Sequence, residues 1–172
     1  MSKGLTKHQL EIISAVASRE AAKHVDQKEK RQKAEQRERN LKNTDLLMKN
    51  YTKLKAMAEE YENEVDEYED TVLDLATLSL ETLEKYHFKT VKMIKHVDAM
   101  IRAYEWNCSK GLPEEKRRYE VLKYRYLVDE KLTVRQLCDR LNTEQATIYR
   151  DTKIAIRDMS VLLFGTAAID FA

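Results

Sequence analysis

The stretch from Thr133 to Gly165 constrains the fold most, because it has the pattern of a short helix, a tight turn and a longer helix. Thr133 is followed three residues later by Gln136, which is the sequence of a capping box at the start of a helix. Asn142 and Thr143, both residue types that favour turns, come next. Apolar residues fall on one face of each helix: Leu137, Leu141, Ile148, Ala155 and Met159. The pattern predicts a helix-turn-helix.

The second helix of this motif carries polar side chains on the face opposite its apolar residues. A helix that reads the DNA major groove needs amide, hydroxyl or guanidinium groups that hydrogen-bond the base edges. We predict base contacts by Gln145, Thr147 and Arg150, and contacts to the DNA backbone by Tyr149 and Lys153. These residue types favour a binding function over a catalytic one.

The run LNTEQATIYRDTKIAIRDMSVLLFG, which ends at Gly165, resembles the C-terminal helix-turn-helix of sigma-70 region 4. It is still more similar to phage-encoded transcriptional regulators of the ArpU/RinA type. The resemblance covers roughly residues 113–165, and residues 147–151 and 160–165 are its most specific parts. It implies a protein that binds DNA near a promoter and activates transcription, often of late phage genes, with host RNA polymerase as a candidate partner.

This chain departs from the family pattern just before the second helix of the motif. Family members usually have an aliphatic residue and then a serine cap, where this chain has Thr143 and Glu144. A carboxylate suits the positive end of a helix. At this position, however, Glu144 would lie close to DNA phosphates, and we expect it to weaken binding.

A further helix is predicted just before the motif. Pro113, the only proline of the chain, is followed by two glutamates, which suits the first turn of a helix. From Glu114 to about Asp129 the apolar residues Tyr119, Leu122 and Tyr126 point in one direction. Phosphate contacts dominate the affinity of proteins for DNA. The basic residues on the other faces are therefore predicted to contact the DNA backbone: Arg117, Arg118, Lys123 and Arg125.

Upstream of these helices, apolar residues recur at alternating intervals of three and four over about four heptads, which predicts a coiled-coil seam. The predicted oligomerisation residues are Tyr51, Leu54, Ala58, Tyr61, Val65, Tyr68, Val72 and Leu75. Residues 59–74 carry nine acids and no base, whereas residues 19–42 carry nine Lys or Arg against five acids. This charge distribution favours antiparallel pairing of the two segments, within or between chains. The alternative is a single helix that packs the same stripe on its own globular core.

Composition supports a helical fold. Charged residues make up 35% of the 172 residues, and there are only three glycines, which favours long helices over an all-β fold. The predicted fold class is all-α, with a long helical and coiled-coil N-terminal region before a C-terminal helix-turn-helix domain. The predicted parts are an elongated oligomerisation or interaction region at 1–106, a linker at 107–113, and a DNA-binding domain at 114–172 with an apolar C-terminal tail.

Several kinds of site are not expected. The four histidines are dispersed, the glycines are isolated, and the carboxylates of residues 59–74 flank the heptad seam. We therefore predict no metal site, no cofactor, no small-molecule substrate and no enzymatic activity. The sequence shows no signal peptide and no apolar run near twenty residues, so a cytoplasmic protein without a membrane partner is expected.

The leading prediction is a homo-oligomeric, sequence-specific regulator of transcription that binds double-stranded DNA. The resemblance implies that it is encoded by a phage. One alternative is a DNA-packaging protein like the small terminase subunit, in which the DNA-binding part usually comes first in the chain. Another is a helical adaptor whose helix-turn-helix packs against protein. The dependence of DNA affinity on salt separates a DNA-binding protein from an adaptor.

Overall fold

The computed structural model describes residues 6–61 and 87–168, and the regular structure within them is helical. Its elements are α1 (Lys7–Tyr61), α3 (His87–Lys110), α4 (Pro113–Leu122), the π-helical turn η3 (Lys123–Leu127), α5 (Val134–Leu141), α6 (Gln145–Phe164) and the 3-10 turn η4 (Gly165–Ala168). The predicted all-α fold with a long N-terminal helix is confirmed. None of the helices in these ranges has a stretch long and apolar enough to cross a bilayer. The chain divides into two compact units, Met1–Gln36 and Arg37–Ala172.

The first unit contains the N-terminal part of α1, which starts with a capping box. The Gln9 backbone N–H donates to Thr6 Oγ1 at 3.3 Å, and the Thr6 N–H donates to Gln9 Oε1 at 2.9 Å. Every side chain from Thr6 to Glu35 is exposed. Ion pairs within the helix, such as Lys23 with Glu20 at 2.7 Å, lie on its surface. This part of α1 is therefore held by its own backbone and by surface charges, and it buries no apolar side chain.

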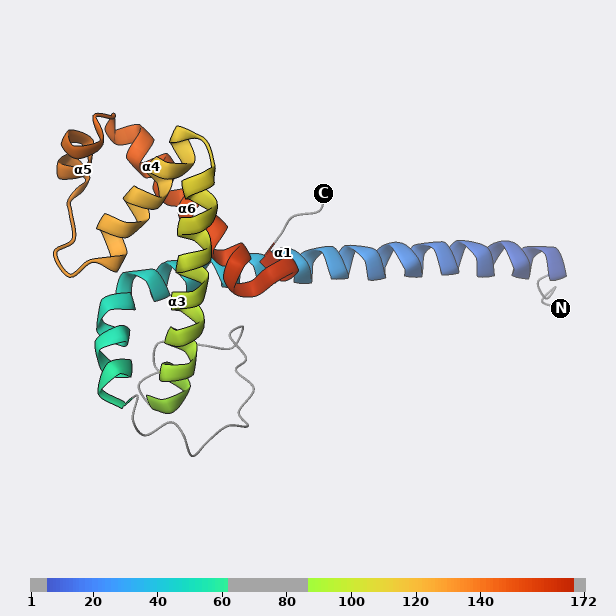
Figure 1. Ribbon diagram of the computed structural model, residues 1–172. Helices are drawn as coiled ribbons and strands as arrows, with labels where there is room; N and C mark the ends of the chain where they lie inside the picture. The colour runs from blue at the N-terminus through green and yellow to red at the C-terminus, as the bar shows by residue number, and fades with distance from the viewer. Residues whose placement is uncertain (1–5, 62–86, 169–172) are drawn as a thin grey trace. The chain divides into compact units, whose positions relative to one another are not determined.

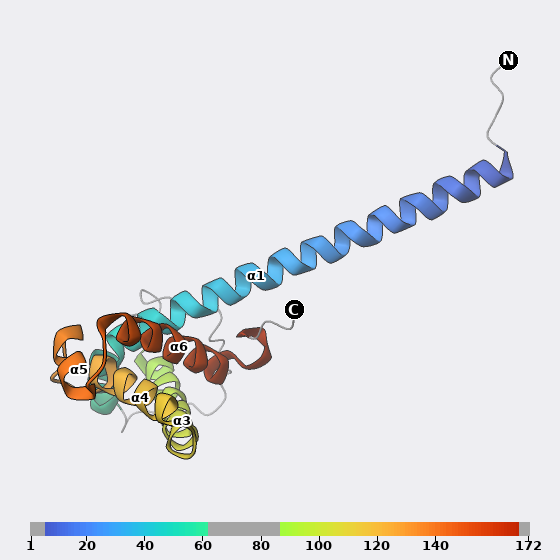
Figure 2. The ribbon, with the colours of Figure 1, turned by 90° about the horizontal axis from the view of Figure 1, so that it is seen from above.

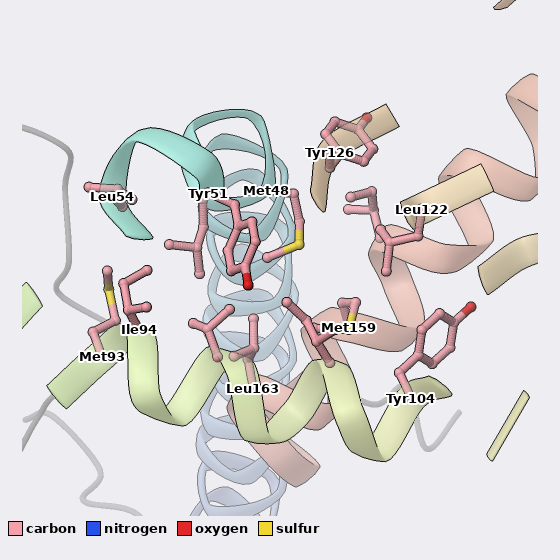
Figure 3. Packing of buried hydrophobic residues seen from close by; sticks show 14 of the residues in the cluster. Met48, Tyr51, Leu54, Met93, Ile94, Tyr104, Leu122, Tyr126, Met159 and Leu163 are labelled. Carbon is pink, nitrogen blue, oxygen red and sulfur yellow. The ribbon is translucent and has the colours of Figure 1, made fainter. Parts of the chain in front are cut away.

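The second unit has one main core, to which α1, α3, α4 and α6 all contribute (Figure 3). Its most deeply buried apolar side chains are Met48, Met93, Val91, Val97, Leu122, Ala155 and Met159. A hydrogen bond at the edge of this core joins α1 to α3, because Tyr51 OH donates to Asp98 Oδ1 at 2.7 Å. Burial raises the pKa of Tyr51 above its usual value, which keeps the hydroxyl protonated and able to donate.

The core corrects part of the predicted coiled-coil seam. Tyr51, Leu54 and Ala58 are 5%, 8% and 5% exposed and pack in the core of their own chain. For these three residues the intramolecular alternative holds, and the predicted role in oligomerisation is wrong. The same spacing of three and four residues occurs on any helix that buries one face, so the pattern did not separate the two outcomes. The side chain of Tyr61, together with Val65, Tyr68, Val72 and Leu75, lies outside the described residues.

The predicted domain boundary also needs correction. Helix α3 continues to Lys110 and α4 begins at Pro113, so only Gly111 and Leu112 of the predicted linker lie between the two helices. Both helices bury side chains in the same core, for example Tyr104 from α3 and Leu122 from α4. Residues 107–113 therefore connect two packed helices within the unit Arg37–Ala172, and they do not separate two domains.

Candidate nucleic-acid interface

The helix-turn-helix is built from α5, a left-handed turn and α6. The Gln136 N–H donates to Thr133 Oγ1 at 3.3 Å and the Thr133 N–H donates to Gln136 Oε1 at 2.8 Å, which confirms the predicted capping box. Helix α5 ends at Leu141, and its C-cap residue Asn142 has a φ of 45°, in the left-handed region that asparagine tolerates well. The Thr143 N–H then donates to the Cys138 carbonyl at 3.1 Å and closes the turn.

A small core of its own fixes α5 against α6. Val121 of α4, Leu137 of α5 and Ile148 of α6 are each 0% exposed and pack together. Partly buried residues surround them: Tyr124, Leu132, Val134, Cys138 and Leu141. Helices α4, α5 and α6 lie next to one another at this end of the unit (Figure 1). The orientation of α6 is thus set by buried side chains on one of its faces.

The opposite face of α6 is exposed to solvent. Its exposed residues are Gln145, Ala146, Tyr149, Arg150, Lys153 and Arg157. Because they recur every three or four residues, they share one side of the helix. Gln145 Nε2 donates to Tyr149 OH at 3.4 Å, so two of these side chains lie against each other. This face presents amide, phenol, guanidinium and ammonium donors to solvent.

Of the three predicted base-reading residues, Gln145 and Arg150 lie on this face, and the side chain of Arg150 is 64% exposed. Thr147 is half-buried at the border of the face. The exposed donors suit an acceptor-rich partner such as the edges and phosphates of duplex DNA.

No family model, curated protein or solved structure matches this chain. The resemblance to sigma-70 region 4 and to the ArpU/RinA type therefore stays a prediction. Within residues 6–61 and 87–168, no group of three or more His, Cys, Asp or Glu side chains is placed to hold a metal ion.

A largely buried ion pair joins α6 to α4 on the side of α6 away from its exposed face. Arg117 Nε of α4 lies 2.6 Å from Asp151 Oδ2 of α6, and the Asp151 side chain is only 1% exposed. Arg150 Nε lies 3.9 Å from the other oxygen of the same carboxylate. Sequence reasoning missed Asp151, although a signal was present. Asp151 lies on the same helical stripe as Ile148 and Ala155, and a buried carboxylate requires a cation or other partner.

This packing corrects two predicted contacts to the DNA backbone. Arg117 is held by Asp151, and Arg118 has a buried Nε and lines a cleft between α3, α4 and α6. Figure 2 shows the physical reason, which is that α4 has α3 on one side and α6 on the other. Arg117 and Arg118, which lie outside the Tyr119–Leu122 stripe, are therefore half-buried as well. Arg117 is thus paired with Asp151 and Arg118 lines the cleft, so neither guanidinium lies on the exposed face of α6 that is the candidate DNA interface.

The other four residues predicted to contact the DNA backbone differ in their exposure to solvent. Tyr149 and Lys153 are exposed on the α6 face, whereas Lys123 and Arg125 are half-buried. Arg125 Nη1 donates to Thr152 Oγ1 at 2.9 Å, which ties the end of the α4 region to α6. Tyr149 and Lys153 are thus the better placed of the four.

Helix α5 adds basic residues that sequence reasoning did not select. Arg135 and Arg140 are both exposed. Arg140 Nη2 donates to Tyr124 OH at 2.6 Å, and its guanidinium lies 4.2 Å from the Tyr124 ring. The first helix of a helix-turn-helix crosses the DNA backbone. Arg135 and Arg140 could have been selected from the sequence, because they are basic residues on the first helix of the motif and lie away from its apolar residue Leu137.

Proposed function

We propose that this chain is a sequence-specific regulator of transcription that binds double-stranded DNA through the N-terminal half of α6. The observation that carries the proposal is the two-sided character of α6. One face is buried against α4 and α5, and the other presents Gln145, Tyr149, Arg150 and Lys153 to solvent. Glutamine and arginine are the side chains that bind adenine and guanine through paired hydrogen bonds.

The affinity would come mainly from phosphate contacts around this face. Tyr149 and Lys153 on α6 and Arg135 on α5 are exposed and can approach the backbone while α6 enters the groove. The net charge of the whole chain is only +1, so attraction to DNA depends on this local group. The resemblance noted above supports a phage late-gene activator, with host RNA polymerase as the proposed protein partner.

The experiment that tests this function is selection of bound duplexes from random double-stranded DNA by the full chain. We expect enrichment of a short motif that contains guanine and adenine, since Arg150 and Gln145 are the proposed readers. The same selection with the Gln145→Ala variant should lose the preference at one position and keep the remainder. Recovery of random sequence alone would contradict the proposal and favour a helical adaptor.

Glu144 provides a prediction about the start of α6. It is the N-cap residue, it is exposed, and its side chain makes no capping hydrogen bond. Replacing it with serine removes a negative charge beside the proposed phosphate contacts and supplies a good N-cap side chain. We expect Glu144→Ser to raise the affinity for duplex DNA several-fold at low salt, in fluorescence anisotropy titrations. The Glu114→Ser variant, which removes an exposed acid from the first turn of α4, is the matched control for the change in net charge.

We also propose that the chain self-associates through the first unit. Leu10, Ile13 and Val16 are 52%, 51% and 54% exposed and share one stripe of α1, next to Ala17. An apolar stripe on a part of a helix where every described side chain is exposed is stabilised by a second copy of the same stripe. Two helix-turn-helix motifs joined in this way would then bind two half-sites on the DNA together.

A charge placed in this stripe should therefore break the oligomer. We expect Ile13→Asp to reduce the mass measured by light scattering of the full chain to that of a monomer. Ala15→Asp is the control, because Ala15 is exposed on the opposite side of α1 and receives the same charge. If wild type is monomeric, or if both variants keep the wild-type mass, this stripe does not join two copies.

A further inference from the structure

Helices α3, α4 and α6 enclose a cleft on the unit Arg37–Ala172 with a volume of about 320 Å³. Arg118 and Glu115 reach it from α4, Tyr104 from α3, and Asp158, Val161 and Leu162 from α6. This volume is at the lower end of the range for small-molecule sites, where a few polar groups orient a ligand against apolar walls. The residues proposed for DNA contact do not line it.

Arg118 forms the basic side of this cleft. It comes from α4 and is one of the residues that line the cleft. Carboxylates match the planar guanidinium group best, because the two groups can form parallel hydrogen bonds. A carboxylate on a ligand in the cleft is therefore the group that Arg118 is suited to bind.

The carboxylates of Asp158 and Glu115 also line the cleft. Asp158 Oδ2 accepts a hydrogen bond from Tyr104 OH at 3.1 Å, which orients the carboxyl group. Burial raises the pKa of Asp158, while Tyr104 and the nearby arginines Arg118 and Arg157 act in the opposite direction. Glu115 Oε2 is already occupied by the backbone N–H of Leu112 at 2.7 Å, so Glu115 adds negative charge to the cleft from a fixed position.

We propose that this cleft binds a small zwitterion of the amino-acid class, whose carboxylate pairs with Arg118 and whose ammonium group pairs with Asp158. The aliphatic part of the ligand packs on Val161 and Leu162. A simple anion would satisfy Arg118 but would be repelled by two carboxylates. A simple cation would be repelled by Arg118 and would leave the guanidinium group without a ligand partner. Only a ligand with both charges satisfies both sides.

Binding is measured by isothermal titration calorimetry on the full chain, with each common amino acid in turn and with acetate, methylammonium and inorganic phosphate as probes that carry one charge. We expect at least one amino acid with an aliphatic side chain to bind with a dissociation constant of about 1 mM or lower, and the single-charge probes to bind at least about tenfold more weakly. A ligand that binds only the folded state should also raise the Tm.

Variants of Arg118 and Asp158 test which side chain binds the carboxylate and which binds the ammonium group of the ligand. Arg118→Ala and Asp158→Asn should each weaken binding at least about tenfold, because each removes a charged hydrogen-bond partner. Arg102→Ala is the control, since Arg102 is exposed on α3 and does not line the cleft. Asp158→Asn is nearly isosteric, so it tests the proposal even if Arg118→Ala unfolds the chain. The proposal is overturned if no amino acid binds, if acetate or phosphate binds as tightly as the amino acids, or if Asp158→Asn binds like wild type. None of these results depends on DNA binding.

Discussion

Replacing Arg117 with alanine is expected to lower the free energy of unfolding by about 3 kcal/mol. The substitution leaves the Asp151 carboxylate, which is 1% exposed, without the guanidinium that lies 2.6 Å away. Removing one partner of a buried pair costs about 3–5 kcal/mol, because the remaining charge stays buried and unpaired. The Arg117 side chain is 24% exposed, so water reaches the pair in part and the lower end of that range is expected.

Urea unfolding followed by far-ultraviolet circular dichroism measures this change. The matched control is Arg150→Ala, because Arg150 lies 3.9 Å from the same carboxylate but is 64% exposed. An exposed pair contributes about 1 kcal/mol or less, so the control should unfold close to wild type. The double variant Arg117→Ala with Asp151→Ala should lose less than the sum of the two single variants, since no charge is left unpaired. Equal stability of Arg117→Ala and Arg150→Ala would show that the pair does not hold α4 to α6.

The second large effect is expected in DNA binding. Arg150→Ala should lower the affinity for the selected duplex by about 1–3 kcal/mol and relax the preference at one base pair. Arg150 is exposed on the face of α6 that carries Gln145, and a guanidinium donates two parallel hydrogen bonds to guanine. The loss should be much smaller on an unrelated duplex, where no such pair forms.

Lys153→Ala separates base reading from attraction to the backbone. Lys153 is exposed on the same face, and its loss should weaken binding to all duplexes about equally and reduce the salt slope by about one. Fluorescence anisotropy titrations on the selected and the unrelated duplex measure both quantities. Arg150 is not a reader if its alanine variant keeps the wild-type affinity for the selected duplex, or if it loses affinity equally for both duplexes.

Features that depend on neighbours in the sequence could be predicted from the residues. Thr133 and Gln136 are three positions apart, so the capping box followed from spacing alone and is present in the structure. Asn142 is a residue type that tolerates a positive φ, and it is the C-cap residue of α5. Leu137 and Ile148 lie on the apolar face of each helix, and both are fully buried.

Features that depend on which helices pack together could not be predicted in the same way. The spacing of Tyr51, Leu54 and Ala58 is the same for a seam between chains and for a face on the chain's own core. Only the helices that pack against α1 in the core decide between the two. Arg117 and Asp151 are 34 residues apart, and no local rule pairs them. The cleft beside Arg118 requires three helices to meet, which the composition of one helix does not reveal.

The affinity for DNA as a function of salt concentration tests the central proposal most directly. It should be measured for the full chain on the selected duplex and on a scrambled duplex of the same length and composition. We predict that the logarithm of the affinity falls linearly with the logarithm of the salt concentration for both duplexes. The selected duplex should stay tighter by about 10³-fold or more at physiological salt. Equal affinity for the two duplexes at every salt concentration, or no binding to either at low salt, would contradict the proposal that α6 reads DNA.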